Sequence, residues 1–172
     1  MYFFAPVAER LRRPAYTRLR QRPDKPLTQV RILPGAPILG AHMNPENSRR
    51  LQSDFPQLYR LQRLDPLRQD IPTMIALWGF ECGDGWMDLI YRLSREISTY
   101  IESIGLDIVA TQVKEKFGTL RFYTDGGDEE VFRLIDAGEH ESATICELCG
   151  APGTLAMKGW CSTRCSSCRQ KC

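Results

Sequence analysis

The chain has no apolar run of membrane-spanning length, and it has almost no histidine. Only His42 and His140 occur among its 172 residues. His140 falls near the end of a predicted helix with no catalytic partner evident, so a Ser/His or Cys/His nucleophile pair has little support. Residues 1 to 6 are too short for a signal-peptide core, and basic residues follow this apolar stretch instead of preceding it. These absences predict a cytoplasmic protein that makes no membrane contact.

Charge is unevenly distributed along the chain. Residues 1 to 43 carry eight Lys and Arg residues against two acidic ones, a net charge of +6. The remaining residues carry 15 basic and 19 acidic side chains, a net charge of −4, which argues against broad contact with a phosphate backbone. Five prolines between Pro14 and Pro37 interrupt regular structure, so residues 1 to 43 are expected to form a disordered basic tail.

The tail also has an interpretation at the level of DNA. Residues 29 to 37, QVRILPGAP, can be encoded as CAG GTT CGA ATC CTG CCG GGG GCA CCA. This string contains the GTTCGAATC of a tRNA T-loop and ends in CCA. The hypothesis is that the start codon was placed too far upstream, over a neighbouring tRNA gene, and that Met43 begins the product. Genomic DNA upstream of the Met43 codon should then contain a tRNA-like sequence.

Four cysteines near the C-terminus form the most informative motif. Cys146, Cys149, Cys165 and Cys168 have the spacing C-x2-C-x15-C-x2-C, which is typical of a tetrahedral zinc site. Each C-x2-C pair presents two thiolates from one turn, with Zn–S distances of about 2.3 Å. Gly150 suits such a turn because it accepts backbone angles closed to other residues. Four thiolates leave no open position for water, so the predicted Zn²⁺ is structural.

The cysteines leave some alternatives open. A disulfide framework or a redox pair remains an alternative for the four, although nothing in the sequence directs the chain to an oxidising compartment. Cys161 is near enough in sequence to Cys165 to exchange with a ligand, and Cys172 lies at the end of the chain. The isolated Cys82 is expected to be a small buried side chain.

The body of the chain is predicted to be α+β, a small helical and β-hairpin domain with an appended zinc-ribbon-like module. An apolar stripe at three- and four-residue spacing predicts a helix at about residues 85–104, with Asp84 at its N-cap and Gly105 ending it. Alternating strands predict a hairpin at about residues 107–124, and Asp128 caps a second helix at about 128–141.

Boundaries follow from these elements. The α+β domain is expected at residues 44–142 and the four-cysteine zinc module at residues 143–172. Within the domain, Asp65-Pro66 and Ile71-Pro72 predict a linker-like stretch between short helical segments and the glycine-rich turn that follows Trp78.

Three motifs carry a resemblance. These are WGFECGDGW at residues 78–86, QVKEKFGTLRFY at 112–123 with DGG at 125–127, and CELCGAPG at 146–153 followed by GWCSTRCSSC at 159–168. Together they resemble a family of small uncharacterised bacterial and phage-borne proteins, over residues 43 to 168. Members of that family begin with a segment like the one at Met43, which agrees with the start-codon hypothesis. The resemblance implies no particular activity.

Two functions follow from these residues. The first is a binding or adaptor protein whose zinc module contacts protein or nucleic acid. Its candidate nucleic-acid contacts are Lys158, Trp160, Arg164 and Arg169, although a Trp packed beside the zinc turn is the favoured explanation for Trp160.

The alternative function is a metal-dependent hydrolase or nuclease. Its candidate catalytic residues are Glu81, Asp84, Asp88 and Lys114, which would need to converge around Mg²⁺ in a concave site. Simpler structural roles for these residues are a helix cap for Asp84, a surface position for Asp88 and a solvated strand end for Lys114.

Overall fold

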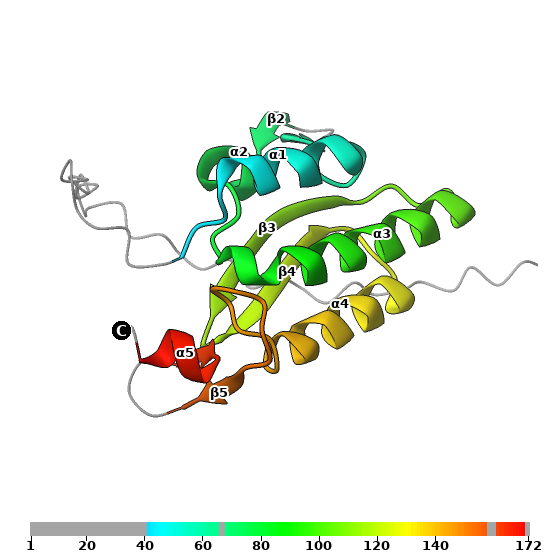
Figure 1. Ribbon diagram of the computed structural model, residues 1–172. Coiled ribbons are helices and arrows are strands. Elements are labelled where there is room, and N and C mark those ends of the chain that lie inside the picture. The colour runs from blue at the N-terminus through cyan, green and yellow to red at the C-terminus, as the bar shows by residue number, and fades with distance from the viewer. Residues whose placement is uncertain (1–40, 66–67, 158–160, 171–172) are drawn as a thin grey trace, which may run out of the picture. The chain divides into compact units, whose positions relative to one another are not determined.

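The computed structural model describes residues 41–65, 68–157 and 161–170, with no side-chain detail for residues 63–70 (Figure 1). Almost all of the predicted basic tail therefore lies outside the described residues. Met43 is buried, and its backbone N–H donates to the carbonyl of Phe80 at 3.2 Å. The residue proposed as the true start is thus part of the folded core.

An antiparallel hairpin forms the centre of the structure. Strand β3, Val109–Lys116, pairs with β4, Thr119–Asp125, through a two-residue connection that sets Lys116 opposite Thr119. A bulge between Ala110 and Gln112 shifts the register near the open end. The hairpin predicted at about residues 107–124 corresponds to these two strands.

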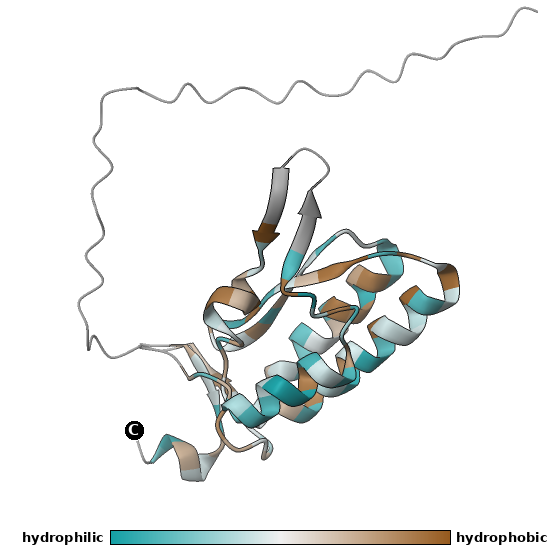
Figure 2. Ribbon diagram, turned by 90° about the horizontal axis from the view of Figure 1, so that it is seen from above, coloured by the Kyte–Doolittle hydropathy of each residue, from teal (hydrophilic) through white to brown (hydrophobic). Residues whose placement is uncertain are grey.

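Two long helices cover one face of this hairpin. Helix α3, Met87–Ile104, and helix α4, Glu129–Ser142, lie side by side against the strands (Figure 1). Both helices carry a mixture of apolar and polar residues, as expected for amphipathic helices (Figure 2). Gly105 ends α3 at φ +68°, and the Asp128 carboxylate accepts the N–H of Val131 at 3.0 Å, so both predicted caps are confirmed.

The hydrophobic core lies between the hairpin and these helices. Trp86, Ile90 and Ile97 of the predicted apolar stripe are fully buried. Gly138 of α4 faces Leu93 of α3 closely enough that an added Cβ would lie 3.0 Å from a Leu93 methyl. The two helices therefore approach each other through a small residue.

One predicted cap is wrong. Asp84 does not cap the long helix, because it begins a short 3-10 turn, η1, Asp84–Trp86, and the N-cap of α3 is Trp86 with no side-chain hydrogen bond. The Asp84 carboxylate instead accepts the backbone N–H of Asn44 and the side-chain amide of Asn47, both at 2.9 Å. A contact with a segment some forty residues away replaces the local one.

The stretch predicted to be linker-like is structured. After α1, Pro45–Asp54, a small antiparallel sheet pairs β1, Gln62–Asp65, with β2, Arg68–Pro72, and α2, Met74–Trp78, follows. Pro72 is the last residue of β2, and the N–H of Thr73 just after it donates to the carbonyl of Leu61 at 3.0 Å. The Thr73 side chain then caps α2 by accepting the N–H of Ala76 at 3.1 Å.

The C-terminal segment adds a third small sheet. Strand β5, Thr154–Ala156, pairs antiparallel with β6, Ser162–Arg164, and α5, Ser166–Arg169, follows. The described part of the chain is thus α+β, built from helices and three two-stranded antiparallel sheets. None of its helices combines the length and apolarity needed to cross a bilayer.

The outer edge of β4 is closed by side chains from α4. The Ser142 hydroxyl accepts the N–H of Leu120 at 2.9 Å, and the Glu139 carboxylate accepts the N–H of Phe122 at 2.9 Å. These two bonds satisfy strand amides that have no strand partner on that side, which is how natural sheets protect an exposed edge.

Replacing Ser142 with alanine tests this closure. Ser142 is fully buried, so Ser142→Ala leaves the Leu120 N–H without an acceptor and should lower the free energy of unfolding by about 1–3 kcal/mol. Urea unfolding followed by circular dichroism measures the change. Ser103→Ala, which removes an exposed hydroxyl on α3, should stay within about 0.5 kcal/mol of the wild type. Equal effects of the two substitutions would contradict the proposed role of Ser142.

Candidate metal centre

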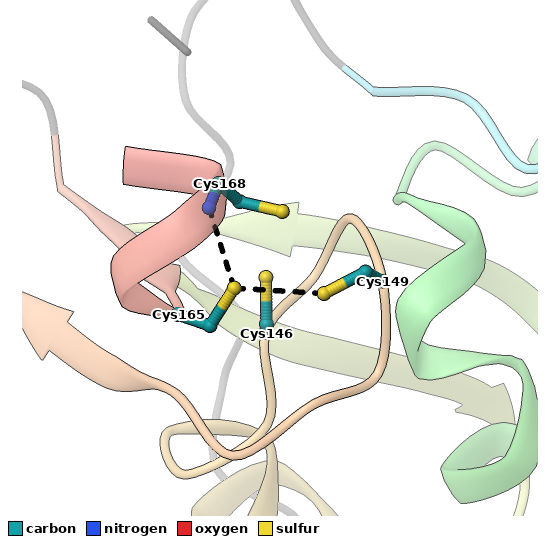
Figure 3. A group of neighbouring side chains, drawn as sticks. All are labelled: Cys146, Cys149, Cys165 and Cys168. Atoms are coloured by element: carbon teal, nitrogen blue, oxygen red, sulfur yellow. Dashed lines mark hydrogen bonds between the residues drawn. The ribbon is translucent and has the colours of Figure 1, made fainter. Parts of the chain in front are cut away.

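The four predicted ligands converge. The Sγ atoms of Cys146, Cys149, Cys165 and Cys168 all lie within 4.8 Å of one another, and none is in a disulfide (Figure 3). The sulfurs of Cys149 and Cys165 are 3.6 Å apart. Sulfurs around a tetrahedral ion at the Zn–S distance lie about 3.8 Å apart, whereas a disulfide needs about 2.05 Å. These cysteines are therefore close enough to hold a metal ion.

The first pair is held in a tight backbone turn. The carbonyl of Cys146 accepts the N–H of Gly150 at 2.9 Å, and the N–H of Cys146 donates to the carbonyl of Ala151 at 2.8 Å. Gly150 has φ +75°, a left-handed conformation that strains residues with a Cβ. The expectation for Gly150 is confirmed. Residues 146–150 are called the first knuckle below.

The second pair is positioned by the last strand and helix. Strand β6 leads directly into Cys165, whose sulfur caps α5 by accepting the N–H of Cys168 at 3.3 Å. The Arg169 guanidinium donates to the carbonyl and the hydroxyl of Thr154 on β5, at 2.9 and 3.0 Å. Strand pairing and this arginine therefore fix the second pair relative to the first.

The four thiols differ in how readily they lose a proton, which bears on their ability to bind a cation. Burial raises the pKa of Cys146, but backbone N–H groups outweigh burial and bring it down to about 6. The N–H of Cys168 is the main cause of the lowered pKa of Cys165. The neighbouring Cys149 and Cys165 sulfurs instead raise the pKa of Cys168 to about 12. Some sulfurs ionise readily while others keep protons, and a divalent cation can replace those protons.

The first knuckle packs directly on the glycine-rich turn. An added Cβ on Gly85 would overlap the carbonyl oxygen of Cys146, and one on Gly83 would overlap that of Glu147. The N–H of Gly85 donates to the carbonyl of Glu147 at 2.8 Å. The indole N–H of Trp86 donates to the carbonyl of Ile145 at 2.9 Å, just before the knuckle. The turn thus needs glycine at positions 83 and 85, because the backbone of the first knuckle occupies the space that side chains there would fill.

Glu147 makes the same contact through its side chain. Its carboxylate is almost fully buried and accepts the N–H of Gly83 at 3.1 Å, while Arg164 lies 3.6 Å away. Burial is the main cause of its raised pKa, which the Gly83 N–H and Arg164 partly offset. No role was predicted for Glu147 from the sequence, although an acidic side chain between two predicted metal ligands is a signal that could have identified it.

The candidate metal-binding segment, residues 146–169, also contacts the tip of the central hairpin. The Thr163 hydroxyl, on β6, donates to the carbonyl of Gly118 at 2.6 Å in a buried position. An added Cβ on Gly118 would overlap a methyl of Leu155, on β5. The short β5–β6 sheet is therefore joined to the hairpin as well as to the cysteines.

The carboxylates of the alternative, catalytic site have other partners. Glu81 accepts the side-chain amide of Gln112 at 2.7 Å, Asp84 holds the start of α1, and Asp88 is exposed on α3. The Lys114 ammonium lies 5.7 Å from the centre of the Tyr123 ring. Within the described ranges, the four cysteines are the only group of three or more His, Cys, Asp or Glu side chains close enough to share an ion.

The candidate nucleic-acid contacts fall into two groups. Arg164 faces the buried Glu147, and Arg169 is bonded to Thr154, so both arginines have roles inside the candidate metal-binding segment. Lys158 and Trp160 lie outside the described residues. Cys82 is buried in the core, as expected, and burial raises its pKa.

Comparisons with protein-family models, with curated proteins and with solved structures found no match. The resemblance of residues 43 to 168 to a small bacterial and phage-borne family therefore stays a prediction. Function has to be argued from the cysteine cluster and its contacts.

Gly85→Ala tests the contact between the knuckle and the turn. The new methyl overlaps the Cys146 carbonyl, so the knuckle must move, and stability should fall by about 1–3 kcal/mol together with a loss of metal affinity. Competition with a chromophoric chelator measures the affinity. Gly105→Ala is the control, since its methyl meets no atom within 4 Å and its left-handed backbone affects stability alone. Unchanged metal affinity in Gly85→Ala would contradict the contact.

Proposed function

We propose that this chain is a binding protein whose C-terminal segment is a zinc-ribbon-like module organised by one structural Zn²⁺. The observation that carries this proposal is the convergence of four cysteine sulfurs within 4.8 Å of one another. The ligands would be Cys146, Cys149, Cys165 and Cys168. Bound there, the ion would supply folding free energy and no open coordination position.

Sulfur chemistry supports zinc as the ion. Thiolates are soft ligands that favour Zn²⁺ and iron over Mg²⁺ or Ca²⁺, and a tetrahedral set of four sulfurs is typical of zinc. The short strands β5 and β6, three residues each, also need a further stabilising element, because a two-stranded sheet is marginal by itself.

A binding role is better supported than catalysis. Four thiolates would fill every coordination position of a tetrahedrally coordinated ion, so no position is left for a water molecule to be activated. Glu81 and Asp84 are engaged by Gln112 and Asn44, and the exposed Asp88 shares no ion-binding cluster with them in the part of the chain that is described. The proposed partner is a protein or a nucleic acid.

Metal analysis of the purified protein tests the site. We expect about one Zn²⁺ per chain by plasma mass spectrometry, and its loss in Cys146→Ser and in Cys165→Ser, because each substitution removes a thiolate. Cys161→Ser is the matched control and should keep the metal. Full metal content in either ligand variant, or iron in place of zinc, would contradict the proposal.

Chelation of the metal should loosen contacts beyond the cysteines. Hydrogen exchange at the Gly85 N–H, which donates to Glu147, should accelerate together with exchange in residues 144–156. The Ala110 N–H, which donates to Leu58 at the open end of the hairpin, serves as the internal control and should stay protected. Mass-spectrometric exchange with and without chelator measures both. Protection of Gly85 that survives chelation would show that the metal does not hold the knuckle on the turn.

A further inference from the structure

The face of the β3–β4 hairpin that points away from the core carries cations and aromatic rings. Strand alternation places its members on one side, and all are partly or fully exposed. With the tip residue they form what is called the hairpin face below: Gln112, Lys114, Lys116, Phe117, Thr119, Arg121 and Tyr123. The intervening Val113, Leu120 and Phe122 are buried in the core.

Each lysine of this face is paired with a ring. The Lys114 ammonium lies 5.7 Å from the centre of the Tyr123 ring, and the Lys116 ammonium lies 5.3 Å from that of Phe117. Across the described residues, neither lysine has a carboxylate within ion-pair distance, whereas Arg121 pairs with Glu139 at 3.3 Å. Glu81 lies beside Lys114 across a backbone bridge, and its carboxylate accepts the side-chain amide of Gln112 at 2.7 Å. The face therefore offers two cations outside any ion pair, next to one carboxylate that is already hydrogen-bonded.

Phe117 is held in an unfavourable conformation. Its φ is +55°, and it is the one residue other than glycine with positive φ among the described residues. A left-handed backbone costs a residue with a side chain about 1–2 kcal/mol, and a two-residue hairpin turn prefers Asn before Gly. The ring does not recover this free energy by burial, because Phe117 is 65% exposed. The hairpin turn imposes this strain, and residues held in such conformations cluster at functional sites.

The metal-binding segment fixes this strained tip. Thr163 donates to the carbonyl of Gly118, and Leu155 occupies the space where a Cβ at that position would lie. The Glu115 carboxylate accepts the Gly118 N–H at 2.5 Å. A turn held from both sides fixes the backbone from which the exposed Phe117 ring projects.

We propose that the hairpin face binds single-stranded nucleic acid, with bases stacking on Phe117 and Tyr123 and phosphates contacting Lys114 and Lys116. Exposed ring faces beside cations match the chemistry of an unpaired strand. A duplex hides its bases and needs a broader cationic surface than this acidic body offers. The inference rests on the proposed function, because the metal-binding segment positions the hairpin tip.

Phe117→Asn in the full-length, metal-loaded chain is the decisive variant. Asparagine tolerates the left-handed turn, so thermal stability should be unchanged or higher while the ring is lost. Fluorescence anisotropy with a labelled oligothymidylate of about 16 nucleotides measures binding. We expect the affinity to fall about 5- to 150-fold, and Tyr123→Ala should act similarly. Phe132→Ala removes a ring that is 53% exposed on α4 and should not change affinity.

The lysines are tested by the dependence of binding on salt. Removing both charges with Lys114→Gln and Lys116→Gln should reduce the slope of log K against log salt by about 1.4, because each phosphate contact to a single strand contributes about 0.7. Arg95→Gln removes an exposed charge on α3 and should leave the slope unchanged. Residues 1–40 are the same in every variant, so any nucleic-acid binding that they contribute does not account for a difference between variants.

Four outcomes would overturn the inference. The first three are absence of oligothymidylate binding by the wild type at low salt, unchanged affinity in Phe117→Asn, and equal losses in the controls. Binding of poly-glutamate but not of the oligonucleotide, with the same sensitivity to these variants, would assign the face to an acidic protein and also overturn it. A chain without bound metal would defeat the proposed function separately, while the hairpin variants would remain comparable with one another.

Discussion

The fold is organised around the close approach of the first knuckle to the turn at Gly83–Gly85. Carbonyl oxygens of Cys146 and Glu147 occupy the space that side chains at these glycines would need. The same turn leads into Trp86, whose ring is fully buried and whose indole N–H bonds back to the segment before the knuckle. One backbone contact therefore joins the hydrophobic core to the cysteine cluster.

The buried Glu147 makes this contact specific. Moving a carboxylate out of water is unfavourable, and a partner such as Arg164 at 3.6 Å often does no more than offset that penalty. The carboxylate also accepts the Gly83 N–H, so only one arrangement of knuckle and turn satisfies it. A charged group that contributes little net stability can still select this arrangement, because every other one leaves the charge unpaired.

Local patterns in the sequence predicted the elements, while contacts between distant segments decided the rest. Cysteine spacing, the apolar stripe of α3 and the caps at Gly105 and Asp128 each depend on residues a few positions apart, and the structure contains all of them. The role of Asp84 was mispredicted because Asn44, a distant residue, binds its carboxylate. The β1–β2 sheet was taken for a linker because its prolines suggested breaks.

Phe117 and Glu147 are the two positions where residue type conflicts most clearly with local preference. A natural sequence tolerates such a conflict where neighbouring structure overrides it, often at a functional site. For Glu147 the neighbouring structure is visible, since the turn and Arg164 surround it. For Phe117 the backbone is held through Gly118 and Thr163, yet the ring itself meets solvent. In the proposed complex, a base stacked on this ring would supply the contact that the ring lacks here.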